Sequence, residues 1–373
     1  MAQSRETIIT VRGGLRLAAR VWGDENADAP SENRWLALHG FLDNAGTYDK
    51  LAPELLAIGA SSVVCLDFAG HGMSDWRSDG VYHLVDYVAD IVYAADALKW
   101  DKFSIIGHSL GGGVAQGVAA TCPDRVMRLV SIEALSWWPQ ESKQFVSNLR
   151  ININTPQKGS NLQVFKSLEE CADRRSKMNI AGALCIDAAR KLVERGAKKV
   201  QKTEAREEGF MWASDPQLLA PSRVRVDELS CQNILESISC PSVVVFAGDG
   251  MWKKAQFMKT RLFTIPWAFA VAAAHMLAAS WHYLSTFGSP LRAEYGKDAS
   301  LASGVKFVYL TLMCRWIKHR SATFIYVPTG GHHPHLTEAA TVAHELGNWL
   351  TTKGKVLNEP AATKSSAAAK KCF

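Results

Sequence analysis

The sequence lacks closely spaced cysteine pairs, and this excludes the usual zinc ribbons and dithiol redox motifs. Its eight cysteines stand apart from one another, several of them in apolar or helix-like stretches. Such isolated residues are typical of buried, reduced thiols rather than of a disulfide framework. The sequence therefore predicts neither structural disulfides nor a cysteine-bound metal. The cysteines are Cys65, Cys122, Cys171, Cys185, Cys231, Cys240, Cys314 and Cys372.

Targeting signals are also missing from the two ends of the sequence. The first residues, MAQSRETIIT, do not contain a basic stretch followed by an apolar one, as a secretory signal would. The last residues, KKCF, match neither a prenylation box nor the peroxisomal SKL address. We therefore expect a cytoplasmic location.

The chain has no strong excess of one charge. Charged residues make up 21% of the sequence and the formal net charge is +6, which by itself does not indicate a nucleic-acid partner. The most basic stretch, 189–206, interleaves acids with its lysines and arginines at helical spacing, which predicts a solvated helix. We therefore expect a protein that does not bind nucleic acid.

One long stretch has no charged residue at all. Residues 262–291 contain no Asp, Glu, Lys or Arg, and this length is enough to span a bilayer. The same stretch contains two histidines and an early proline, which favour an atypical apolar insertion, at about 262–317, packed against the protein. The alternatives are membrane association through 262–291 and a gene-model artefact, such as a retained intron, that the mature message does not contain.

Short apolar runs alternate with helix-like segments through most of the chain. Runs such as Ser62–Leu66 and Ser242–Phe246 are continuously apolar, which is typical of parallel strands covered by helices on both faces. This rhythm breaks in the middle of the chain, where helical segments predominate, and a tail rich in Ala, Lys and Ser follows it. The predicted organisation is an α/β core at 1–134 and 241–352, a helical cap at 135–240 and a disordered tail at 353–373.

A G-x-S-x-G motif follows the apolar run that begins at Phe103. It reads Gly107-His108-Ser109-Leu110-Gly111 and precedes a helix-like segment. A serine on such a strand-to-helix turn is raised above the edge of the sheet, and small residues two before and two after it prevent a clash between strand and helix. The motif therefore predicts that Ser109 is a nucleophile.

A serine hydroxyl needs a base, and the best candidate follows the last predicted strand. There the sequence reads GGHHPHLTE, and His332 comes directly after the two glycines. His333 and His335 are rivals in the same loop. No paired carboxylates or cysteines stand at ligand spacing beside these histidines, so we expect no metal. The chemistry needs no organic cofactor either.

An acid is needed to orient the histidine, and two residues compete for this role. Asp249 follows the strand-like run SVVVF, and the order Ser, Asp, His along the chain is the usual one for this architecture. Glu133 follows the run LVSI and can reach the same imidazole from a neighbouring strand end. We favour Asp249 and keep Glu133 as the alternative acid.

Two backbone N–H groups are expected to bind the oxyanion that forms on the substrate. One is the N–H of Leu110, directly after the serine, and the other is that of Phe41, where Gly40 allows a close approach. Three tryptophans are candidates for the wall of an acyl pocket, although buried tryptophans are more often part of a core. They are Trp137, Trp138 and Trp212.

Taken together, these residues resemble the α/β-hydrolase superfamily. The segments LHGFLDNAGTYDKL, LDFAGHGMSDW and ALKWDKFSIIGHSLGG look closely similar to those of the serine hydrolase-like proteins within it. The resemblance covers most of residues 5–261 and 319–352. It implies an α/β-hydrolase fold with a mostly parallel eight-stranded sheet, a helical cap after the sixth strand and a Ser-His-acid triad. The insertion at 262–317 departs from the family pattern.

The expected function is that of a serine esterase or thioesterase acting on a small acyl substrate through an acyl-enzyme intermediate. Two alternatives remain open on sequence alone. A member of the fold without catalytic activity would bind a small molecule under its cap. A membrane-associated lipase would use 262–291 to contact lipid. The sequence does not predict an oligomeric state.

Overall fold

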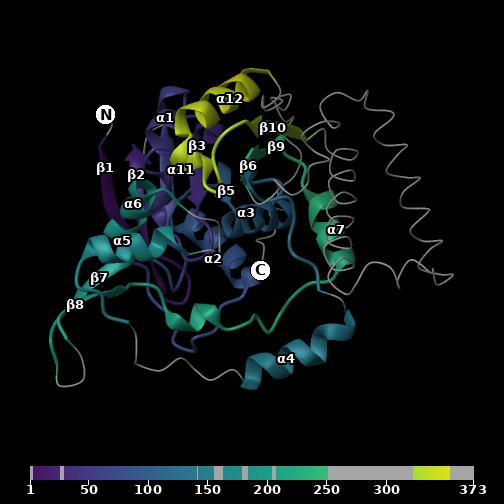
Figure 1. Ribbon diagram of the computed structural model, residues 1–373. Coiled ribbons are helices and arrows are strands. Elements are labelled where there is room, and N and C mark those ends of the chain that lie inside the picture. Colours follow the sequence, from purple (N-terminus) through teal and green to yellow (C-terminus); the bar gives the residue numbers. More distant parts are fainter. Residues whose placement is uncertain are drawn as a thin grey trace, which may run out of the picture.

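An eight-stranded sheet lies at the centre of the protein (Figure 1). The computed structural model describes residues 3–25, 29–140, 142–154, 163–178, 184–203, 207–250 and 322–352. The strand order is β1-β2-β4-β3-β5-β6-β9-β10, and within this sheet only β2 runs antiparallel to its neighbours. This confirms the predicted eight-stranded, mostly parallel sheet. Its strands are β1 (Ser4–Thr10), β2 (Arg16–Gly23), β3 (Arg34–Leu38), β4 (Ser62–Leu66), β5 (Phe103–His108), β6 (Val126–Ile132), β9 (Ser242–Ala247) and β10 (Thr323–Val327).

Helices cover both faces of the sheet, so that its central strands are buried on both sides. Every residue of β4, β5 and β9 is buried, which explains why these strands are continuously apolar. One core lies between the sheet and α2, α3 and α7, and a second lies between the sheet and α1 and α12. The helices are α1 (Leu51–Ala57), α2 (Leu84–Ala97), α3 (Leu110–Thr121), α4 (Phe145–Asn154), α5 (Leu168–Ser176), α6 (Ile186–Gly196), α7 (Glu228–Ser237), α11 (Pro334–Thr337) and α12 (Ala339–Thr352).

The chain between β6 and β9 carries α4 to α7 and a small second sheet. In this sheet β7 (Ala197–Val200) pairs antiparallel with β8 (Gly209–Trp212). The sequence predicted one solvated helix over 189–206, but α6 ends at Gly196 and Lys198 lies on β7. The prediction of a helix is therefore wrong after Gly196, because the backbone of 197–200 is extended and pairs with β8.

Two buried arginines join this segment to the loops that follow β3 and β4. Arg175, on α5, donates to Asp43 Oδ1 at 2.6 Å, and Arg195, on α6, donates to Asp67 Oδ2 at 2.9 Å. A buried ion pair is strongly destabilised when one partner is removed, because the other charge is then left without compensation. These contacts therefore hold α5 and α6 over the carboxyl ends of the parallel strands.

Among the helices that the structure describes, none combines the length and the apolar character needed to cross a bilayer. The predicted insertion at 262–317, with its apolar part at 262–291, lies outside the described residues. The predicted tail at 353–373 also lies outside them.

Candidate active site

Ser109 occupies a tight turn between β5 and α3. Its backbone has φ 52° and ψ −115°, a conformation that is strained for a residue with a side chain. A Cβ at Gly107 would lie 2.1 Å from the Gly111 carbonyl oxygen, and one at Gly111 would lie 2.3 Å from that of Leu38. Only glycine fits at these two positions, so the strand and the helix can approach closely and raise the Ser109 side chain at their junction.

His332 lies beside this turn, and Glu133 is the carboxylate against its ring. His332 is buried, and its Nδ1 is 3.3 Å from Glu133 Oε2. If Nδ1 carries the proton toward this acceptor, Nε2 bears the lone pair of the neutral imidazole. Nε2 is buried and has no hydrogen-bond partner within the described residues. In this tautomer the lone pair of Nε2 is not used by any of the described residues.

Hydrogen bonds of both the backbone and the side chain hold Glu133 in place. Its backbone has φ 53°, and its N–H donates to the Val245 carbonyl at 2.9 Å. Its Oε1 accepts from the Ala247 N–H at 2.7 Å, and the side chain is buried. This carboxylate thus links the ends of β6 and β9 while its second oxygen lies against His332.

Asp249, the acid that the sequence favoured, lies in the turn after β9 and is exposed. Its N–H donates to the Gly330 carbonyl at 3.0 Å, so its backbone holds the loop that leads to His332. The structure therefore pairs His332 with Glu133 beside the serine turn, and the backbone of Asp249 lies in the supporting turn after β9.

The other two histidines of the loop face different partners. His333 Nε2 is 2.9 Å from Asp43 Oδ2, and His335 Nε2 is 2.8 Å from Thr47 Oγ1. Both rings are buried. Of the three histidines in the sequence GGHHPHL, His332 is the one whose ring contacts Glu133.

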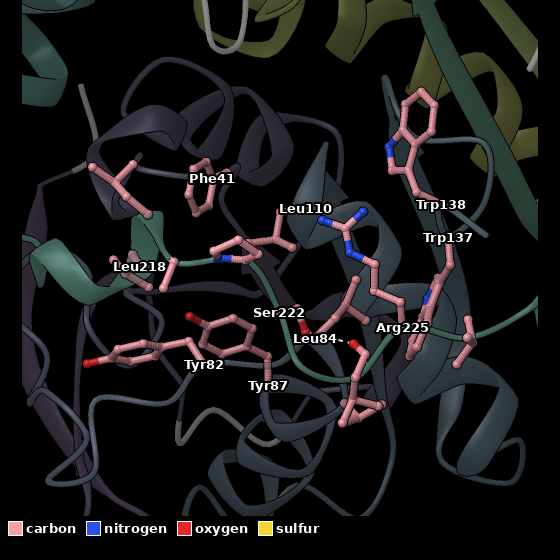
Figure 2. A pocket seen from close by; sticks show the side chains of 16 residues that line it. Phe41, Tyr82, Leu84, Tyr87, Leu110, Trp137, Trp138, Leu218, Ser222 and Arg225 are labelled. Carbon is pink, nitrogen blue, oxygen red and sulfur yellow. Dashed lines mark hydrogen bonds between the residues drawn. The ribbon is translucent and has the colours of Figure 1, made fainter. Parts of the chain in front are cut away.

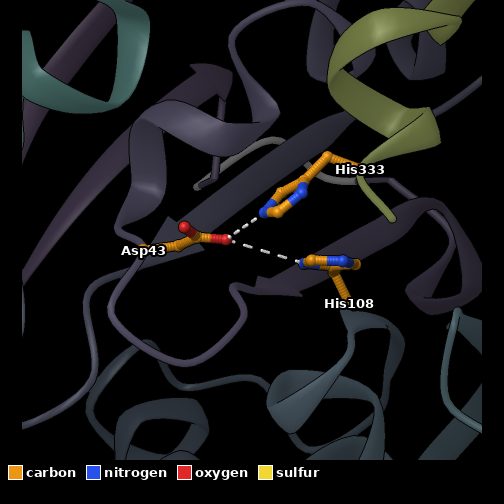
Figure 3. Close-up of side chains that lie close together, drawn as sticks. All are labelled: Asp43, His108 and His333. Atoms are coloured by element: carbon orange, nitrogen blue, oxygen red, sulfur yellow. Dashed lines mark hydrogen bonds and ion pairs between the residues drawn. The ribbon is translucent and has the colours of Figure 1, made fainter. Parts of the chain in front are cut away.

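Behind the turn, Asp43, His108 and His333 form a buried cluster (Figure 3). Burial would raise the pKa of Asp43, but its interactions with His333 and with the Arg175 guanidinium bring it well below its usual range. Burial and the neighbouring histidines lower the pKa of His108 well below its usual value, and burial also lowers that of His333. The carboxylate is therefore ionised, and both imidazoles are neutral near pH 7.

His108 connects this cluster to the loop of His332. Because a carbonyl oxygen can only accept, the His108 Nε2–H donates to the His332 backbone oxygen, at 2.7 Å. The Nδ1 of the neutral ring is then unprotonated and lies 3.7 Å from Asp43 Oδ2. His108, the residue before Ser109, is thus hydrogen-bonded to the backbone of His332.

Among the described residues, Asp43, His108 and His333 are the group that could hold a metal ion, since their ligand atoms lie within 4.8 Å of one another. Asp43 already accepts hydrogen bonds from His333 and Arg175. These donors compensate the carboxylate charge, so the cluster is explained as a hydrogen-bonded network. The expectation that the chemistry needs no metal stays a prediction.

The loop after β3 comes close to the serine turn. A Cβ at Gly40 would lie 2.8 Å from His108 Nδ1, so glycine is needed for this approach. His39 fixes the loop, because its ring accepts from the Phe68 N–H at 3.0 Å and donates to the Gly40 carbonyl at 2.7 Å. Phe41 follows directly, and both Phe41 and Leu110 line the cavity beside the serine turn.

A cavity of about 530 Å³ opens beside Phe41 and Leu110 (Figure 2). Its deeper wall includes the buried side chains of Tyr87, Trp137 and Leu218. Such a volume and an apolar wall are typical of small-molecule sites. Trp137 and Trp138 line the cavity, whereas Trp212 packs against Phe165.

Sequence reasoning did not identify three participants in this region. Asp43 and His108 have no motif of their own, because the cluster joins residues more than sixty positions apart. Arg225, which lines the cavity, stands in an unpatterned connection before α7. The one signal in the sequence was the histidine before Ser109, which the G-x-S-x-G motif treats as a variable position.

Comparisons with known proteins support the α/β-hydrolase fold. A family model described as "alpha/beta hydrolase fold" matches residues 36–160, which include the serine turn. A serine hydrolase-like protein of Danio rerio is 31% identical over 242 residues, covering 64% of this chain and 70% of that protein. A serine hydrolase-like protein of Dictyostelium discoideum is 29% identical over 252 residues, covering 66% of this chain and 67% of that protein.

A solved structure is similar over almost the whole of its length. It is a hypothetical protein from Pseudomonas aeruginosa PAO1, with a TM-score of 0.69 and 26% sequence identity. The similarity covers 93% of this chain and 99% of that one.

Proposed function

Because the chain belongs to the α/β-hydrolase superfamily, we propose that it is a serine hydrolase that cleaves a carboxylic ester or thioester. The observation that carries this proposal is the pairing of His332 Nδ1 with Glu133 Oε2 at 3.3 Å, beside a serine held at φ 52°. A histidine oriented in this way has its other nitrogen available as a general base.

In the first half of the reaction, Ser109 Oγ attacks the carbonyl carbon of the substrate. The hydroxyl proton moves to His332 Nε2, and the resulting imidazolium is stabilised by the Glu133 carboxylate. The negative charge on the carbonyl oxygen is bound by the N–H groups of Leu110 and Phe41. The bond to the leaving oxygen or sulfur then breaks, and His332 returns the proton to that atom.

In the second half, water takes the place of the alcohol or thiol. His332 accepts a proton from water, the hydroxide attacks the acyl carbon, and the ester bond to Ser109 breaks as its oxygen regains a proton. Related folds that hydrolyse haloalkanes or epoxides use a carboxylate at the turn. Serine at this position favours acyl transfer.

A fluorophosphonate probe tests the proposal directly. We expect the wild-type protein to be labelled and peptide mass spectrometry to find the label on Ser109, because the probe reacts with activated serines. Ser109→Ala should show no label. Ser147→Ala removes an exposed serine of α4 and should be labelled like the wild type. Lack of labelling in the wild type would contradict the proposal and favour a binding protein without catalysis. Undiminished labelling of Ser109→Ala would show that the probe reacts with another residue and would contradict the assignment of Ser109 as the nucleophile.

A further inference from the structure

The cavity beside Phe41 and Leu110 has an uneven distribution of charge. No aspartate or glutamate lines it, and Arg225 is its one charged residue within the described chain. Tyr87, Leu218 and Trp137 in the deeper wall are buried, whereas Trp138 is 53% exposed and Arg225 is exposed as well. The cation therefore lies at the open end of an otherwise apolar cavity.

The other polar side chains of the wall already have protein partners. Tyr82 Oη donates to Asp215 Oδ2 at 2.6 Å and accepts from the Arg77 N–H at 3.0 Å. Ser222 Oγ donates to the Val224 carbonyl at 2.6 Å, and the Trp137 indole donates to the Gly113 carbonyl at 2.7 Å. These groups shape the cavity without offering a free donor to a ligand.

Arg225 differs from them, because no described residue is a partner of its side chain. Within the part of the chain that the structure describes, its guanidinium forms no hydrogen bond or ion pair. Its backbone is held by the next residue, since the Val226 carbonyl accepts from the Gln140 N–H at 2.8 Å. Figure 2 shows the Arg225 side chain extending toward Leu110, the residue that follows Ser109.

We infer that Arg225 binds an anionic group of the substrate, so that the acyl compound hydrolysed here carries a carboxylate or a phosphate. This inference rests on the proposed serine hydrolase function. A guanidinium presents five donors in a planar fork, which matches the two oxygens of a carboxylate or phosphate. The apolar part of the substrate contacts the deeper wall of the cavity, and the anionic group remains at the mouth, where Arg225 lies.

The anion can belong either to the acyl part or to the leaving group, and two pairs of matched esters distinguish these sources. One pair is para-carboxyphenyl butyrate and para-carbamoylphenyl butyrate, which differ in the leaving group. The other is the phenyl monoester of glutaric acid and the corresponding glutaramic acid ester, which differ in the acyl part. In each pair an ionised carboxylate is replaced by a neutral amide of similar size.

The measurement is kcat/KM for the four esters with wild-type protein, Arg225→Gln, Arg225→Lys and Arg223→Gln. Arg223 is the matched control, because it is a neighbouring exposed arginine that lies outside this cavity and donates to Asn152 Oδ1. The wild type should prefer the anionic member of at least one pair by about 10- to 100-fold, the range for a charge-assisted hydrogen bond. Arg225→Gln should bring that ratio close to one, Arg225→Lys should keep part of it, and Arg223→Gln should keep all of it.

A preference that is equal in Arg225→Gln and wild type would overturn the inference, and so would a wild type that does not distinguish either pair. In both results the neutral esters are still cleaved, and the proposed hydrolase function stands. Failure of the wild type to cleave any of the four esters, together with absence of fluorophosphonate labelling, would instead count against the hydrolase function itself.

Discussion

Glu133→Gln is expected to lower kcat/KM for a neutral phenyl ester by about 10³- to 10⁴-fold, the loss typical of an amide in place of the acid of a triad. Glutamine cannot stabilise the imidazolium that forms when His332 takes the proton of Ser109. Its amide can also donate to Nδ1, which would select the tautomer with Nε2 protonated and remove the base. The measurement is steady-state hydrolysis combined with the rate of fluorophosphonate labelling.

Asp249→Asn is the matched comparison, and its kcat/KM should stay within about tenfold of the wild-type value. Asp249 is exposed, and the carboxylate against His332 is that of Glu133. The variant also keeps the backbone N–H of residue 249, which donates to the Gly330 carbonyl. Glu133→Gln should also remain folded, since the Gln amide oxygen can still accept from the Ala247 N–H that Glu133 binds now. Thermal unfolding of both variants checks this point.

The reverse result would assign the acid differently. If Asp249→Asn lost three orders of magnitude while Glu133→Gln stayed active, the turn after β9 would have to move its side chain to His332 in the working enzyme. Glu133 would then be a structural link between β6 and β9. The two variants together thus decide between acids that the sequence alone left open.

The serine turn could be predicted because its determinants are local. The strand, the glycines and the helix stand within twenty residues, and each has a steric reason that can be read from the sequence. The sheet could be predicted for a similar reason, since strands such as β4 and β9 are apolar throughout. Local patterns also identified the loop that carries His332.

The contact between Glu133 and His332 could not be predicted, because Glu133 and Asp249 both follow strands whose carboxyl ends meet at the same edge of the sheet. The difference lies in side-chain direction, which depends on the φ of 53° at Glu133 and on the turn that exposes Asp249. The contact between Arg175 and Asp43 joins residues 132 positions apart, and no spacing rule connects them. The cavity also joins residues that are far apart in the sequence, since Phe41 and Arg225 both line it.

The protein is expected to lose stability as the pH falls below about 6.5, because several buried histidines are neutral when it is folded. Burial lowers the pKa of His39 to about 4 and that of His71 to about 3. The pKa values of three further histidines are also lowered by burial. These are His108, His333 and His335.

The direction of the effect follows from where the protons bind. Above pH 6.5 these histidines are neutral in both the folded and the unfolded chain, so they do not change stability. Below it the unfolded chain binds protons that the folded chain does not, and each histidine lowers the free energy of unfolding by about 1.4 kcal/mol per pH unit. His39 and His71 together lower it by roughly 3 kcal/mol at pH 5.5, a sizeable part of the stability of many domains, and the three further histidines act in the same direction.

Urea unfolding at pH 7.5, 6.5 and 5.5 measures this loss, and calorimetry in two buffers counts the protons taken up. His71→Phe should reduce the uptake on unfolding by about one proton at pH 5.5, because the unfolded variant no longer has this imidazole to protonate. Phenylalanine suits the site, since the His71 ring packs near Phe68 and Tyr87 and its buried Nε2 has no hydrogen-bond partner within the described chain. His344→Gln changes an exposed histidine of α12 and should leave the uptake unchanged. A free energy of unfolding that is the same at pH 7.5 and 5.5 would show that these rings are protonated or hydrated in the folded protein, and the neutral network behind Ser109 would have to be abandoned.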